Sequence, residues 1–79
     1  MTVTTTKAFE LYHEFNVSET ADAQILELAE YAIKEGCTTE ESLLPIITYF
    51  VKSTFDIKHR LLIEKFTADV MYEIDALVA

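Results

Sequence analysis

The apolar residues of this chain are densest between Leu43 and Val51, where Thr48 is the only polar residue. Such a stretch is unfavourable in water, so other segments of the chain or a partner must cover it. Pro45 is the only proline in the sequence, and it would remove a hydrogen bond from a helix that began near Thr39. The pattern therefore predicts a kink or a fresh helix start near residues 42–45, with helix to about residue 53.

Two caps are compatible with this helix. Thr38 and Glu41 have the spacing of a capping box. If Ser42 is the cap instead, Pro45 falls in the first turn, where its missing N–H costs little. The residues from Ile46 to Val51 are also good strand formers, so helix and strand both stay open for this segment.

A first helix is expected at residues 6–15, because its apolar residues recur at three- and four-residue spacing: Ala8, Leu11, Tyr12 and Phe15. Thr5 or Thr6 can cap it. Residues 1–5 are expected to be disordered.

A second helix is expected at residues 19–35, with Asn16 or Ser18 as its cap. Its apolar residues share one face, whereas Glu30 and Lys34 form a favourable pair on another. Gly36 follows at once, and glycine adopts the left-handed conformation that ends a helix without steric cost.

The last helix is expected from residue 57 almost to the end, with Asp56 as its cap. It would have roughly 21 residues and a length of about 30 Å. Its apolar stripe is wider than one buried face requires, and it consists of Leu62, Ile63, Phe66, Val70, Met71, Ile74, Leu77 and Val78.

These elements predict an all-α fold in a single domain, residues 1–79: a small bundle of about four helices, two short, one medium and one long at the C-terminus. One glycine and one proline among 79 residues exclude a turn-rich all-β chain. A hydrophobic content of 51% is more than so short a chain can hide. We therefore expect dimerisation to complete the bundle. Most aromatic side chains should lie in the core, with Tyr49 and Tyr72 at a solvent-exposed edge.

The charges of the last helix suggest how two copies would pack. Its start is basic and its end acidic, the reverse of what the helix dipole favours. In an antiparallel pair the basic end of one chain would face the acidic end of the other, as an isologous interface requires. The predicted interface combines apolar and charged side chains: Leu62, Phe66, Val70, Ile74 and Leu77 with Lys58, Arg60, Lys65, Asp69 and Glu73. A solvated face on a monomer, or a hetero-complex, are the alternatives.

Charge and composition also limit the function. The net charge is −8, which opposes direct binding to nucleic acid or anionic membranes. A single cysteine cannot form an intrachain disulfide and favours a reducing compartment. The first seven residues lack the pattern of a signal peptide, so a cytoplasmic location is expected. A single glycine cannot form a phosphate-binding loop, and no cofactor is expected.

Two parts of the sequence carry residue types that can support chemistry. Glu10 and His13 have the Glu-x-x-His spacing of di-iron bundles, with Glu27 and Glu30 as further ligands, but a second motif is missing, and a solvated His13 is the simpler interpretation. Cys37 lies just before a helix start, where a thiol can become reactive, but no histidine is near it in the sequence.

The sequence therefore favours a non-enzymatic acidic helical protein that acts through protein–protein interaction as an adaptor, assembly factor or inhibitor. An alternative is an acidic mimic of nucleic acid that blocks a basic surface on a host protein. The third and weakest hypothesis is a carboxylate and histidine metal site.

Overall fold

A computed structural model describes residues 3–79 and contains four helices in this part of the chain: α1 Val3–Asn16, α2 Ala21–Lys34, α3 Glu40–Phe55 and α4 Arg60–Val78. The predicted all-helical fold is confirmed, and residues 46–51 are helix, not strand. The expected disorder of residues 1–5 falls in part on residues 1–2, which lie outside the described residues.

The start of α1 differs from the prediction. The helix begins at Val3, so Thr5 and Thr6 lie inside it and do not occupy the cap position.

α3 is capped by a residue that the sequence did not single out. The hydroxyl of Thr39 accepts a hydrogen bond from the backbone N–H of Ser42 at 3.2 Å, and the hydroxyl of Ser42 accepts one from the N–H of Thr39 at 3.1 Å. This reciprocal pair is a capping box. α3 then continues through Pro45 to Phe55, so a fresh helix start at residues 42–45, one of the two predicted alternatives, is wrong. The other alternative, a kink near Pro45, stays a prediction.

The cap predicted for α4 is also wrong. Asp56 has a left-handed backbone, with φ of 55°, and it ends α3 by donating its N–H to the carbonyl of Lys52 at 2.9 Å. His59 caps α4 instead, because its Nδ1 accepts a hydrogen bond from the N–H of Leu61 at 3.2 Å.

The two ends of α2 differ in how well the sequence predicted them. Its cap position is Thr20, which makes no side-chain capping bond; Ser18 stabilises the turn just before it by accepting from the N–H of Thr20. The predicted stop at Gly36 is confirmed, with φ of 77°. The N–H of Cys37 donates to the carbonyl of Ala32 and that of Gly36 to the carbonyl of Ile33, which is a Schellman motif.

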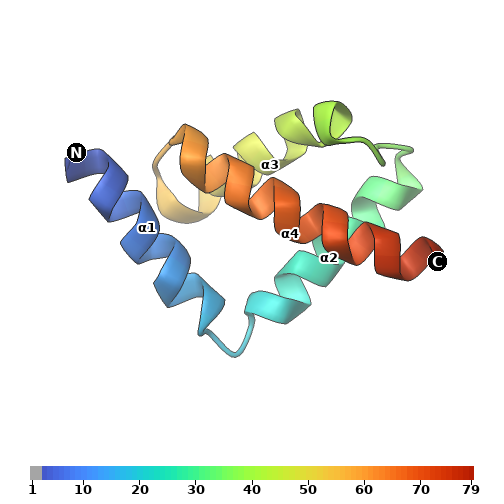
Figure 1. Cartoon of the computed structure of the whole chain (residues 1–79), viewed down its shortest axis with the longest axis horizontal. Helices are drawn as coiled ribbons and strands as arrows, with labels where there is room; N and C mark the ends of the chain where they lie inside the picture. The colour runs from blue at the N-terminus through green and yellow to red at the C-terminus, as the bar shows by residue number, and fades with distance from the viewer. Residues whose placement is uncertain (1–2) are drawn as a thin grey trace.

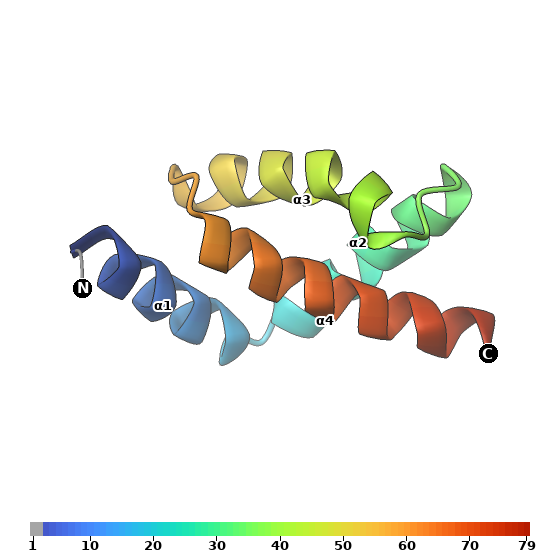
Figure 2. The ribbon, with the colours of Figure 1, turned by 45° about the horizontal axis from the view of Figure 1, so that its top comes forward.

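α4 is the central helix of the molecule. Figures 1 and 2 show it crossing α2 and running antiparallel to α3, with α1 beside its N-terminal half. The two termini lie at opposite ends of the molecule (Figure 1). All four helices contribute to the core, whose most buried large side chains come from α3 and α4: Leu43, Ile47, Val51, Leu62, Phe66, Val70 and Ile74.

An aromatic cluster around Phe66 joins three helices. The ring of Phe66 lies 5.1 Å from Phe15 of α1, 5.3 Å from Phe50 of α3 and 5.2 Å from Tyr12 of α1, all edge to face. Phe55 at the end of α3 stacks on it at 5.7 Å. Each such contact contributes about 0.5–1.5 kcal/mol beyond its buried area.

The helices are more equal in length than predicted: α1 and α2 have 14 residues each, α3 has 16 and α4 has 19. The predicted excess length of the last helix over the other three is correspondingly smaller. Any case for a second chain must therefore rest on the surface of α4, not on its length.

Candidate interaction surfaces

The structure places most of the predicted apolar interface inside the chain's own core. Leu62, Phe66, Val70 and Ile74 are at most 2% exposed. They pack against α2 and α3, so they are not accessible to a second copy of the folded chain. Leu77, at 45% exposed, is the one apolar member of the set that stays on the surface.

The charged members of that interface are also dispersed. Lys58 lies in the connection before α4. Arg60 forms an ion pair within its own helix, with its Nε 3.1 Å from Oε1 of Glu64. Asp69 and Glu73 are half-buried, and Lys65 is exposed. The predicted charged face is therefore not a single surface.

Asp69 has a specific partner within the chain. The Tyr12 hydroxyl donates to Oδ2 of Asp69 at 2.5 Å and thereby ties α1 to α4. Partial burial, together with this hydrogen bond and the negative charge of Asp69, raises the pKa of Tyr12 to about 12. Tyr12 is protonated at neutral pH and acts as a donor to the carboxylate.

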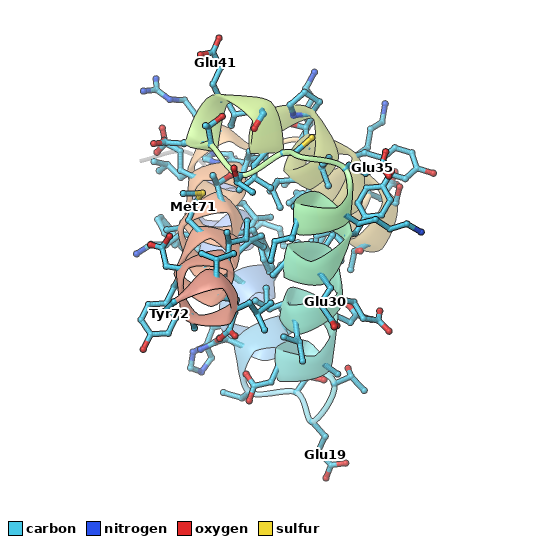
Figure 3. All side chains as sticks on the ribbon, turned by 90° about the vertical axis from the view of Figure 1, so that its right-hand side faces the viewer. Glu19, Glu30, Glu35, Glu41, Met71 and Tyr72 are labelled. Atoms are coloured by element: carbon cyan, nitrogen blue, oxygen red, sulfur yellow. The ribbon has the colours of Figure 1, made fainter. Side chains whose placement is uncertain are left out.

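The exposed side of α4 carries a second regular pattern, which we call the outer stripe. It consists of two series at seven-residue spacing: Leu61, Ala68 and Asp75, and Lys65, Tyr72 and Ala79. At about 100° per residue these six positions fall within an arc of roughly 80°. All six are exposed, Tyr72 by 74%, and Figure 3 shows Tyr72 projecting away from the molecule. The predicted exposure of Tyr49 and Tyr72 is confirmed.

A groove lies between α2 and α3, because both helices pack on α4 and make little contact with each other. Its wider part has a volume of about 500 Å³ and an almost wholly apolar lining. The lining side chains come from one face of each helix: Leu28 and Tyr31 of α2, with Pro45, Ile46, Tyr49, Phe50 and Ser53 of α3. Tyr31 is 52% exposed and Tyr49 is 76% exposed, so the groove is open to solvent.

The groove continues towards the start of α2 as a narrower and more polar part of about 340 Å³, which adds Gln24, Glu27 and Thr54. Gln24 is one of these lining residues, and its Oε1 is buried and accepts no hydrogen bond from any residue between 3 and 79. We call the two parts together the α2–α3 groove.

The sequence contained a signal for this groove that we did not use. On α2, Gln24, Leu28 and Tyr31 lie at four- and three-residue spacing, and on α3, Ile46, Phe50 and Ser53 do the same. Both stripes can be read from the sequence as helical faces. That the two faces point into one groove depends on the angle at which α2 and α3 cross α4.

The residues considered for chemistry do not converge. Glu10 and His13 are exposed on α1, and within residues 3–79 no group of three or more His, Cys, Asp or Glu side chains could hold a metal ion. Cys37 is a half-buried free thiol that donates a long hydrogen bond to the carbonyl oxygen of Glu35, with 3.9 Å between Sγ and the oxygen.

The acidic residues from Glu10 to Glu41 are all on the surface. All nine carboxylates in this part of the chain are exposed, and Figure 3 shows Glu19 and Glu41 projecting from two ends of the molecule. None of the helices described for residues 3–79 is long and apolar enough to cross a membrane.

Comparison with protein-family models, with curated proteins and with solved structures finds no match for this chain. The functional inference therefore rests on its surfaces.

Proposed function

We propose that this chain is a non-enzymatic, cytoplasmic interaction protein that works as an antiparallel homodimer assembled through the outer stripe of α4. The observation that carries this proposal is the self-complementarity of the stripe. The outer stripe takes the place of the interface predicted from the sequence, because the chain's own helices cover the apolar face of α4 on which that prediction was based.

The stripe is symmetric about position 70. When two copies of α4 run antiparallel with this position at the two-fold axis, Leu61 lies opposite Ala79, Lys65 opposite Asp75, and Ala68 opposite Tyr72. Each pair joins a large side chain to a small one or a positive charge to a negative one. An isologous interface needs such matching, because every contact occurs twice.

The remaining charges near this face weaken the pairing, because Glu40 lies beside Ala68, Tyr72 and Asp75, and Glu73 lies beside Tyr72. Glu64, which borders the stripe, already has its charge compensated by Arg60. A single helix face is smaller than the roughly 800 Å² per partner of a standard interface. We therefore expect a dimer that dissociates on dilution.

The test is molecular mass by light scattering across a dilution series. The wild-type chain should reach the mass of two 9.0 kDa chains. Lys65→Asp and Asp75→Lys should each weaken the dimer at least about tenfold, because each places like charges opposite one another twice. The double variant restores opposite charges and should recover the dimer.

Lys34→Asp is the matched control, since it makes the same charge change at an exposed site on α2. A wild-type chain that stays monomeric at every concentration would refute the dimer. So would a double variant no better than the single ones.

A second candidate function, an acidic mimic that occupies the nucleic-acid-binding surface of a basic protein, is supported by the exposure of all nine carboxylates between Glu10 and Glu41. It is tested by the salt dependence of binding to such a protein, and a flat salt response would exclude it.

A further inference from the structure

We propose that the α2–α3 groove binds a short amphipathic helix with a basic end, supplied by a partner protein. This inference rests on the proposed function as an interaction protein and names the class of partner. The groove and the outer stripe are separate surfaces that share no residue.

The shape of the groove suits a helix. Its α3 wall extends from Pro45 to Thr54, which at roughly 1.5 Å per residue is about 14 Å, or two to three helical turns. The lining is apolar along most of this length, with Leu28, Ile46 and Phe50 half-buried. A helix of this length presents apolar side chains at positions i, i+3 or i+4, and i+7 to such a groove.

The aromatic residues define the open edge of the groove. Tyr31 on α2 and Tyr49 on α3 border its wider part from both sides. Exposed tyrosines are well suited to binding because they provide a large contact area and one polar group.

The narrow part of the groove specifies the orientation of the occupant. The carboxylate of Glu27 lines this part and only accepts hydrogen bonds. A Lys or Arg side chain at one end of the bound helix would donate to it.

The charge of the chain favours a basic partner. Glu27 is the charged side chain among the residues that line the groove, whereas Asp22 and Glu40 lie beside Tyr72 of α4. The chain as a whole has a net charge of −8, which attracts a basic partner.

The probe for the test is a fluorescent peptide of about 14 residues with leucines on one helical face and lysines and arginines elsewhere. Two further peptides serve as controls: one with the same composition but a scrambled pattern, and one with every basic residue replaced by glutamate. Binding is measured by fluorescence anisotropy, and the site is mapped by chemical-shift changes in the labelled protein.

The basic amphipathic peptide should bind at least about tenfold more tightly than either control, with the largest shift changes at Leu28, Ile46 and Phe50. Tyr31→Ser with Tyr49→Ser should weaken binding about tenfold or more. Both side chains are exposed, so the variant should fold. Glu27→Gln removes the carboxylate that lines the narrow part and should reduce the preference for the basic peptide.

Tyr72→Ser is the matched control, because it removes an equally exposed tyrosine from the outer stripe. It should leave peptide binding unchanged while weakening the dimer. Equal binding of the basic and acidic peptides, or shift changes outside the groove, would overturn the proposal. An apolar dye that binds the groove when the peptide does not would overturn it in favour of a small ligand. Failure of the dimer test alone would leave these results unaffected.

Discussion

At the scale of single residues, Tyr12 is the clearest link between α1 and the rest of the molecule. Its ring packs edge to face on Phe66, and its hydroxyl donates to Asp69. α1 contacts α4 less extensively than α2 and α3 do. Tyr12 therefore contributes a large part of the contacts that hold α1 against α4.

Replacing Tyr12 with Phe should therefore lower the free energy of unfolding by about 1–2 kcal/mol. The ring contact is kept, but the hydrogen bond to the carboxylate is lost, and bonds to charged groups are stronger than neutral ones. Urea unfolding at neutral pH measures the difference. Tyr72→Phe, which removes a hydroxyl exposed to solvent, should have no effect.

The same bond predicts a pH dependence. Because the pKa of Tyr12 is raised from 10.0 to about 12 in the folded chain, the unfolded chain loses this proton first. The stabilisation is complete below pH 10 and is lost as the pH rises from 10 towards 12. Wild-type protein should thus lose stability faster than Tyr12→Phe over this range, and parallel curves would contradict the assigned bond.

At the scale of the helix, Pro45 is the residue least suited to its position. It is the sixth residue of α3 and cannot donate to the carbonyl of Glu41 one turn earlier. Its ring is exposed and lines the α2–α3 groove. The first turn of α3 is held instead by the capping box of Thr39 and Ser42.

Pro45→Ala should stabilise the protein by about 1–3 kcal/mol, since it restores the missing hydrogen bond in a residue type that favours helices. Thermal and urea unfolding would measure this gain. Ser53→Ala, also in α3 and exposed, provides the control for a change that leaves the backbone hydrogen bonds intact. A destabilised Pro45→Ala variant would show that the proline ring contributes packing that outweighs its cost.

The helices were predictable because their apolar spacing is a local property of the sequence. The stop at Gly36 was predictable because few residues other than glycine adopt a left-handed backbone. Asp56 was assigned to the wrong helix because an aspartate side chain can cap the start of a helix. In the structure the backbone of Asp56 is left-handed, and the residue ends α3 instead. A polar residue between two helices does not show whether it ends the preceding helix or caps the following one.

The candidate site was harder to predict than the helices. The pattern of α4 correctly identified Phe66 and Val70 as buried, but it does not show whether the chain or a partner buries them. Only the packing of α2 and α3 on α4 answers that question. The groove that includes Gln24 and Tyr49 depends on the same packing.

At the scale of the whole molecule, the two faces of α4 differ. Its inner face packs against α2 and α3, and its outer stripe is exposed, where we propose that a second copy binds. Because α2 and α3 are joined mainly through α4, the surface between them stays open as a groove. The nine exposed carboxylates between Glu10 and Glu41 surround these surfaces with negative charge.

This distribution of charge allows the nucleic-acid mimic to be tested directly. A labelled DNA duplex is bound to a basic DNA-binding domain, and the chain is added as a competitor while anisotropy is recorded. If the chain is a mimic, it should displace the duplex at near-stoichiometric concentration. Its own affinity for the domain should fall by at least about tenfold between 50 and 200 mM salt, because screening weakens contacts between exposed charges.

A variant with Glu27→Gln, Glu30→Gln and Glu35→Gln keeps the shape of α2 but removes three of the exposed charges, and it should compete correspondingly less well. If competition fails, or if the variant competes as well as the wild-type chain, the carboxylates are a solvated surface and not a recognition site. In that case Glu27, which lines the narrow part of the α2–α3 groove, is the carboxylate at which we still expect negative charge to contribute to binding.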